Sequence, residues 1–574
     1  MASDAPELSG VEKIKDESQY LRGTIHDELS SEKSSFHKDT TQLLKFHGTY
    51  QQDDRDLRKG LAKQGKEKAY SCMVRCRIPG GGITAAQLVA FLDLCDLLGN
   101  STLKITTRQT FQLHGVLKKD LRATIRRINE IQLSTLAACG DVNRNIMCCP
   151  AKRVGTVHQV LQDLAQELTI ALAPQTGAYY ELWVIDPDTG EKSLAAGGQE
   201  PKQESEPLYG PHYLPRKFKI GIALPEDNCI DIYTQDLGFL AVVRDNQVIG
   251  YNVLVGGGMG MTPSADKTFP ALAKRMAFAK PDQVVDVAKA VIMVQRDFGN
   301  RTDRKVARMK YLIANWGIGK FRQKVEEYFG ASLPDCTADD VYGFDDHMGW
   351  QEQGDGLWSY GLNVENGRLY DNDHVKLKAA FRAIALRWDM PMRLTSHQSI
   401  IFCDIKPEDR EGLLQVLRDH GIRLTEDTST VRRWSIACVG LPTCGLAVTE
   451  SERALPGIID RLEAPLAKLG LNQEAFTIRM TGCPNGCARP YNADIGLVGQ
   501  TVGRYRLFMG GALLGKRLNY LYKEKVAADD VVGEIVAVCS AFKTHRREGE
   551  TLGGFCSRVG RDELERLAAE APTV

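Results

Sequence analysis

Four of the fifteen cysteines form two tight groups whose spacing could hold an inorganic centre. Cys438 and Cys444 have a C-x5-C spacing, Cys483 and Cys487 have a C-x3-C spacing, and about forty residues separate the groups. Both groups lie among glycines and prolines. Glycine lets the backbone approach a bulky group closely, and proline keeps a segment out of regular helix or strand. The sequence therefore predicts two irregular loops that present four thiolates.

Four thiolates on two loops are typical ligands of a cuboidal iron–sulfur cluster. A structural zinc site is the first alternative, but its cysteine pairs usually have C-x2-4-C spacing, which the first group does not match. Idle thiols are the second alternative. The residues favour the cluster and leave the other two interpretations open. The remaining cysteines are scattered, in part within apolar strings, and are expected to be buried and inert.

Basic residues concentrate in four motifs of the N-terminal half. These motifs are VRCRIPGGG with Arg75 and Arg77, TTRQTFQLHG with Arg108, VNRNIMC with Arg144, and LPRKFKI with Arg216, Lys217 and Lys219. Alternate residues of a strand share a face, so Lys217 and Lys219 would repel each other unless an anion lies between them. Any one of these cations alone would be read as exposed surface charge. Together they predict an anion site.

The composition limits the class of protein. The 574 residues predict three or four domains. Lys+Arg and Asp+Glu both number 73, so no global positive field exists for nucleic acid or an anionic membrane. No apolar run approaches the roughly 18 residues of a membrane span. The N-terminus has no apolar leader, so a cytoplasmic location is expected. The glycine run at 255–260 lacks the dinucleotide-binding order and is read as structural.

The chain also resembles itself. Residues 104–111 match residues 393–400 at an offset of 289, and the same offset relates Cys149 to Cys438. Residues 236–241 match residues 494–499 at an offset of 258. The sequence thus predicts two copies of a two-part unit, related by a pseudo-twofold axis, of which only the C-terminal copy carries the cysteine quartet.

Each copy of the first part is predicted to run strand, helix, strand, strand, helix. In the first copy the expected strands are 72–78, 102–107 and 111–116, with a last helix over 121–131. Thr84 and Gln87 form a capping box, and apolar residues at i, i+3, i+4 and i+7 follow it. In the second copy Asp373 is the expected cap of a helix over 375–386.

At this point the motifs identify a family. TGCPNGCARP with the upstream C-x5-C resembles the siroheme and 4Fe–4S signature of sulfite and nitrite reductases. The likeness covers nearly the whole chain, through LLKFHGTYQQDDRDLR, RCRIPGGGIT, TTRQTFQLHGVLKK, NRNIMC, YLPRKFK and QRDFGNRTDRK. YLRGTI near the start favours the NADPH-dependent assimilatory sulfite reductase branch. The resemblance implies six-electron reduction of sulfite to sulfide.

The resemblance also implies roles for single residues. The 4Fe–4S cluster would be held by Cys438, Cys444, Cys483 and Cys487, and Cys487 would also bridge to the siroheme iron. Sulfite would be bound by Arg75, Arg144, Lys217 and Lys219, with the lysines as proton donors and the arginines as electrostatic clamps. Siroheme would be contacted by Lys104, Arg108, His114, Arg216 and Asn485. Cys149 has no recognisable partner group and is expected to be structural.

The implied fold is α+β, a pseudo-twofold repeat of ferredoxin-like half-domains plus two mixed α/β domains that bind siroheme and the cluster. The expected divisions are an extension over 1–70 that wraps the core or meets a partner, half-domains at 71–150 and 355–435, a first siroheme and anion domain at 151–354, and a cluster domain at 436–574. Residues 192–210 are expected to form a surface loop.

Three alternatives remain open on sequence. A siroheme nitrite reductase would act on a less charged anion than the paired lysines suggest. The chain has no flavin-binding unit, so electrons would come from an NADPH-using flavoprotein alpha subunit or from ferredoxin. A non-catalytic binding protein stapled by zinc is the rival of another class, and it would be colourless.

Overall fold

The computed structural model describes residues 7–571, except 156, 176–180, 186–188, 190–191 and 198–205. Four five-stranded sheets and one two-stranded sheet lie within this described part. None of its helices combines the length and apolar character that crossing a membrane requires.

The first ferredoxin-like half-domain has the predicted order of elements. They are β2 (Tyr70–Arg75), α5 (Ala85–Leu97), β4 (Leu103–Ile105), β5 (Phe111–Val116) and α6 (Leu121–Glu130). The capping box at the start of α5 is present, with the Gln87 backbone N–H donating to the Thr84 hydroxyl. The sequence prediction is confirmed here because both periodicity and capping are local signals.

The second half-domain repeats this order, with one correction. Its elements are β14 (Trp358–Leu362), α11 (Leu377–Trp388), β16 (Met392–Leu394), β17 (Ile400–Ile405) and α12 (Arg410–Asp419). Asp373 does not cap α11, which begins two residues later than expected. The carboxylate of Asp371 instead accepts the backbone N–H of Lys378 at 2.8 Å. The offset of 289 holds for the two strands that follow, but α11 begins 292 residues after α5, so the position that the offset assigned to the cap was wrong.

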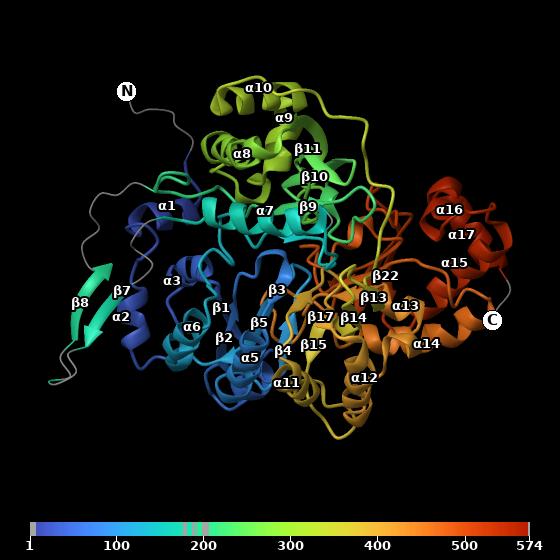
Figure 1. Ribbon diagram of the computed structural model, residues 1–574, viewed down its shortest axis with the longest axis horizontal. Coiled ribbons are helices and arrows are strands. Elements are labelled where there is room, and N and C mark those ends of the chain that lie inside the picture. The colour runs from blue at the N-terminus through green and yellow to red at the C-terminus, as the bar shows by residue number, and fades with distance from the viewer. Residues whose placement is uncertain are drawn as a thin grey trace.

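The two half-domains exchange strands and form one body (Figure 1). The first sheet has the order β1-β2-β5-β4-β15, and the second has the order β13-β14-β17-β16-β3. Here β1 covers Thr49–Asp53 and β13 covers Gly349–Glu352. Strand β3 (Gly82–Ile83) thus leaves the first copy to pair with β16, while β15 (Arg368–Leu369) leaves the second to pair with β4. One hydrophobic core runs through both copies. The α+β fold and its pseudo-twofold repeat are confirmed.

The other two five-stranded sheets, called the large sheets below because they contain the longest strands, are also copies of each other. One is β12-β11-β10-β9-β6 and the other is β18-β19-β20-β21-β22, and in both two parallel pairings precede two antiparallel ones. The strands of the first are β6 (Met147–Cys148), β9 (Ile220–Ala223), β10 (Leu237–Arg244), β11 (Gln247–Val255) and β12 (Lys274–Ala279). Those of the second are β18 (Ser435–Ala437), β19 (Ile478–Thr481), β20 (Ile495–Thr501), β21 (Arg504–Met509) and β22 (Tyr520–Ala527).

Helices cover these two sheets and give each its own core. The first has α7 (Val157–Ala171), α8 (Val284–Phe298), α9 (Met309–Trp316) and α10 (Ile318–Phe329), and the second has α14 (Leu455–Lys468), α15 (Val531–His545), α16 (Leu552–Val559) and α17 (Arg561–Glu570). In Figure 1 the first set lies above the half-domains and α15–α17 lie to the right. Parallel strands need crossover connections, which α14 supplies between β18 and β19.

The N-terminal segment packs onto the rest of the chain. It contains α1 (Gly10–Glu17), α2 (Ile25–Ser30), α3 (Thr40–Leu43), β1 (Thr49–Asp53) and α4 (Arg58–Lys63). Leu21, Leu43 and Phe46 lie in the core of the first large sheet, and β1 pairs with β2. The apolar periodicity of this segment is weak because the buried residues of α1 are the charged Glu12 and Lys15, which form an ion pair with each other.

The region expected as a surface loop over 192–210 differs in part. It begins with strand β8 (Lys192–Gly197), which pairs with β7 (Glu181–Ile185). Residues 198–205 lie outside the described residues, so the loop prediction is not tested there.

Candidate active site

Two parallel neighbouring strands deliver the cysteine groups to one edge of a sheet. Cys438 follows β18 directly, and Cys483 lies two residues after β19, which pairs with β18 in parallel. The Gly482 backbone N–H donates to the Cys438 sulfur at 3.3 Å. A Cβ atom at Gly482 would lie 2.6 Å from the Thr449 carbonyl oxygen, so only glycine allows this approach. The predicted meeting of two loops is present.

Electrostatic interaction joins every pair of sulfurs in the quartet of Cys438, Cys444, Cys483 and Cys487. Burial, and then the neighbouring sulfurs, raise the pKa of Cys444 to about 11. The same causes raise the pKa of Cys438 and of Cys483. Four thiolates held this close repel one another, so a cationic centre between them is what would stabilise the charged form.

Three of the predicted anion-binding cations interact with Cys487, the exposed member of the quartet. They are Arg75 at the end of β2, and Lys217 and Lys219 just before β9. Burial, followed by the charges of Arg216 and Arg308, lowers the pKa of Lys217 to about 7. Burial and the charge of Arg108 also hold the pKa of Lys219 well below its ordinary value. Lys217 is therefore poised to release a proton near neutral pH.

Hydrogen bonds fix the direction of the two arginines. Arg75 donates to the Gln112 side-chain oxygen at 2.8 Å and to the Cys139 sulfur at 3.3 Å, and its buried Nε has no hydrogen-bond partner. Arg144 donates from Nε to the Gly140 carbonyl at 2.8 Å. The charge of Arg144 contributes to the lowered pKa of Lys217, so it belongs to the same group of cations.

The residues expected to contact siroheme fall into two sets. Arg108 donates to the Gln235 side chain at 2.9 Å but leaves its buried Nε without a partner. His114 likewise leaves Nδ1 without one, while Asn485 donates to the Cys483 sulfur at 3.3 Å. The other two residues, Arg216 and Lys104, already lie beside carboxylates of the chain. Arg216 lies 3.9 Å from Asp141, and Lys104 forms an ion pair with Glu452.

Sequence reasoning missed Arg308 as a member of this site. Arg308 is buried and pairs with Asp236 at 2.5 Å, and its charge lowers the pKa of both Lys217 and Lys219. Asp236, the partner of Arg308, begins the segment that matches residues 494–499. That repeat was the one feature of the sequence that drew attention to this pair. The glycine run packs on the second cysteine loop, where the Met261 backbone N–H donates to the Pro484 carbonyl at 3.1 Å. Its expected structural role agrees with this contact.

The residues present fit the groups that the sequence implied. Four cysteine sulfurs on one edge are the donor set of a 4Fe–4S cluster. Buried arginine and histidine nitrogens without partners are costly unless an acceptor reaches them, and the carboxylates of a siroheme would supply acceptors. Cys149, expected to lack a partner group, instead lies beside Asp227 and His347.

Comparisons with known proteins agree with this fold. The family described as "Nitrite and sulphite reductase 4Fe-4S domain" matches residues 139–333. The "Nitrite/Sulfite reductase ferredoxin-like half domain" matches residues 63–131 and 351–420, which are the two strand-exchanged copies. The first match covers the N-terminal large domain and not the cysteine quartet, as expected if the two large domains are copies.

Individual relatives cover almost the whole chain. The sulfite reductase (NADPH) hemoprotein beta-component of Chromohalobacter salexigens is 44% identical over 96% of both chains. The sulfite reductase (ferredoxin) of Synechococcus elongatus is 43% identical over 98% of this chain and 91% of that protein. The structure of the Mycobacterium tuberculosis NirA protein superposes with a TM-score of 0.78 at 26% identity, covering 97% and 98% of the two chains.

The duplicated α+β fold, with a cysteine quartet beside a group of cations, indicates a redox protein. The chain belongs to the nitrite and sulfite reductase family.

Proposed function

We propose that this protein is the catalytic hemoprotein subunit of an assimilatory sulfite reductase, which reduces sulfite to sulfide at a siroheme coupled to a 4Fe–4S cluster. The observation that carries the proposal is the convergence of the cysteine quartet with Arg75, Lys217 and Lys219 around Cys487. Relatives named as sulfite reductases cover nearly the full length and support it.

The cations suit the substrate and the proton demand of the reaction. Reduction of SO₃²⁻ to HS⁻ takes up six electrons and seven protons and releases three waters. Arg75 and Arg144 stay charged and would hold the dianion and polarise its S–O bonds. Lys217 and Lys219 would donate protons to the departing oxygens, which their lowered pKa values favour.

The cofactors would pass on the electrons of the donor and supply the metal chemistry, while the chain supplies ligands, orientation and an electrostatic field. Cys438, Cys444, Cys483 and Cys487 would hold the cluster, and Cys487 would also reach the siroheme iron. Arg108, His114, Arg216 and Asn485 would orient the siroheme. Lys104 is assigned here as a more distant contributor, since Glu452 already neutralises its ammonium.

The electron donor is proposed to be an NADPH-oxidising flavoprotein subunit. Several relatives carry the name sulfite reductase (NADPH) hemoprotein beta-component, whereas the relative from Synechococcus elongatus carries the ferredoxin name. Co-purification of a flavin-bearing chain from the native source, with NADPH-driven turnover, would support this donor. Turnover with reduced ferredoxin and none with the flavoprotein would contradict it.

The proposed reaction is tested by a visible spectrum and by rates on two anions. Purified protein should show siroheme absorption and contain iron and acid-labile sulfide. With a chemically reduced dye as donor, kcat/KM should be higher for sulfite than for nitrite. A colourless protein would support the zinc-stapled alternative, and a preference for nitrite would favour the nitrite reductase assignment.

Substitution of one cluster cysteine tests the coupling of the two cofactors. Cys483→Ser should lose the cluster and siroheme together. Cys483 and Cys487 lie on the same loop, and Cys487 would hold both the cluster and the siroheme iron. Cys336→Ser, at a half-buried thiol that donates to the Ala277 carbonyl, is the matched control and should keep both. A Cys483→Ser protein with an intact siroheme spectrum would contradict a shared site.

A further inference from the structure

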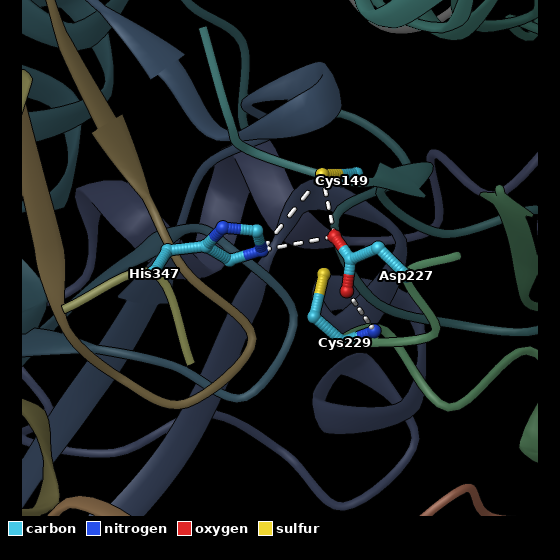
Figure 2. Close-up of side chains that lie close together, drawn as sticks. All are labelled: Cys149, Asp227, Cys229 and His347. Carbon is cyan, nitrogen blue, oxygen red and sulfur yellow. Dashed lines mark hydrogen bonds and ion pairs between the residues drawn. The ribbon is translucent and has the colours of Figure 1, made fainter. Parts of the chain in front are cut away.

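A second group of metal-binding side chains lies in the N-terminal half. The potential ligand atoms of Cys149, Asp227, Cys229 and His347 all lie within 4.8 Å of one another, and all four residues are buried. The Cys149 sulfur is 2.7 Å from Asp227 Oδ2 and 3.8 Å from His347 Nε2. His347 Nε2 is 3.0 Å from the same carboxylate oxygen. Figure 2 shows the four side chains pointing toward a common centre.

The neighbouring groups leave one ligand atom of Asp227 and one of His347 facing the centre of this group. Asp227 Oδ1 accepts the backbone N–H groups of Cys229 and Asp345 at 3.0 and 3.3 Å, so Oδ2 faces inward. His347 Nδ1 lies 3.7 Å from the Asp345 carboxylate, which leaves Nε2 inward. A carboxylate that accepts from the second nitrogen is the usual support of a metal-binding histidine. Here the 3.7 Å separation is too long for a hydrogen bond, and Nδ1 has no hydrogen-bond partner among the described residues. His158 also borders the Cys149 thiol.

The position of this group in the fold is equivalent to that of the cysteine quartet. The offset of 289 relates Cys149, directly after β6, to Cys438, directly after β18. The offset of 258, which relates Asp236 to Asp494, also relates Cys229 to Cys487. Two cysteines of the N-terminal copy thus occupy the positions of two cluster ligands, and Asp227 and His347 complete a different set.

We propose that Cys149, Cys229, Asp227 and His347 bind one zinc ion, a mononuclear centre at the pseudo-twofold counterpart of the iron–sulfur cluster. Two sulfurs, one imidazole nitrogen and one carboxylate oxygen match the ligand types and the coordination number of structural zinc. Ligand atoms a few ångströms apart surround a single ion; the sulfurs of a cuboidal cluster stand further apart. Sulfur ligands disfavour Ca²⁺ and Mg²⁺.

The site would fasten three separate segments together. Cys149 lies after β6, Asp227 and Cys229 lie in the loop after β9, and His347 lies just before β13 (Gly349–Glu352) of the second half-domain sheet. A zinc ion there would therefore join the first large sheet to the half-domain body. With four protein ligands the site is closed, so the role is structural and leaves no position for substrate.

Metal analysis of the full-length holoprotein tests the proposal. Zinc and iron are measured on the same sample by mass spectrometry, for wild type, Cys229→Ala, His347→Gln and the control Cys336→Ser. We expect about one zinc per chain in wild type and in the control, and a roughly tenfold or larger loss in the other two. Iron content and the siroheme spectrum are recorded separately, so failure of the zinc site is distinguishable from failure of the proposed enzyme.

X-ray absorption at the zinc edge keeps the test decisive if a variant does not fold. Wild-type protein should show two sulfur neighbours at about 2.3 Å and two lighter neighbours at about 2.0–2.2 Å. Absence of zinc after growth in zinc-supplemented medium, a shell without sulfur, or a Cys149–Cys229 disulfide in a non-reduced peptide map would each overturn the proposal.

Discussion

At the scale of single residues, the site combines charges that folding alone would not favour. Lys217 is half-buried; burial and then the charges of Arg216 and Arg308 lower its pKa, and the charge of the Cys487 sulfur opposes them. Burying cations next to one another costs free energy unless an anion offsets it. A bound dianion would supply that compensation, which is why this arrangement indicates a function and not a structural ion pair.

Lys217→Met should separate proton donation from cofactor assembly. We expect siroheme and cluster spectra like wild type and a kcat for sulfite lower by about 10²–10⁴-fold, the usual contribution of a positioned acid. Steady-state rates with a reduced dye measure this. Lys217→Arg keeps the positive charge, but a guanidinium is a poor proton donor. Its KM for sulfite should therefore stay closer to the wild-type value than its kcat. Lys274→Met, at an exposed lysine of β12, is the control. Normal turnover of Lys217→Met refutes the donor role.

At the scale of elements, the N-terminal segment is held by buried groups that the hydropathy pattern does not reveal. The short helix η1 (Leu44–His47) places Phe46 in a core and buries the imidazole of His47. Burial lowers the pKa of His47 to about 4, although a hydrogen bond with the Leu21 backbone opposes the change. The folded state therefore favours the neutral imidazole.

This burial predicts an acid-sensitive segment. The stabilisation is complete above the unfolded pKa of about 6.5 and is lost as pH falls from there toward 4. Between pH 7.5 and 5.5 the group should cost about 1–2 kcal/mol of unfolding free energy. Thermal midpoints at the two pH values, at one scan rate, measure it. His47→Gln should flatten the difference relative to wild type, and the exposed His26→Gln should not. An equal slope in both variants would refute this assignment.

At the scale of the whole molecule, a buried ion network joins the two copies. Asp231 of the N-terminal copy pairs with Arg489 at 2.5 Å and Arg479 at 2.7 Å, both from the C-terminal copy. Burial opposes the charge of Asp231, but the two guanidinium groups outweigh it and lower its pKa. The offset of 258 relates Asp231 to Arg489 itself, so the pair lies across the pseudo-twofold axis.

Asp231→Asn should weaken the union of the copies. Removing one partner leaves two buried guanidinium groups without a counter-charge, which costs about 3–5 kcal/mol. We expect a thermal midpoint lower by several degrees and a reduced siroheme content, since the cofactor would lie between the copies. Glu563→Gln, which breaks an exposed pair with Arg566 within α17, should leave both unchanged. A wild-type midpoint in Asp231→Asn would show that the network does not hold the copies together.

The sequence alone determined the local and repeated features. Capping at Thr84 and the offset of 289 predicted the two half-domain copies, and the offset of 258 predicted the copies of the second part. Cysteine spacing among glycines predicted the loops of the quartet. These signals survive in sequence because they depend on residues near one another along the chain or on duplication.

Only the tertiary structure decided which distant residues meet. The exchange of β3 and β15, the pairing of Lys104 with Glu452, and the approach of Arg308 to the lysines depend on packing between segments that are far apart along the chain. The group around Cys149 draws its members from three separate segments, with no short motif to mark it. Side-chain proximity of this kind has no period or spacing, so it appears only once the chain is folded.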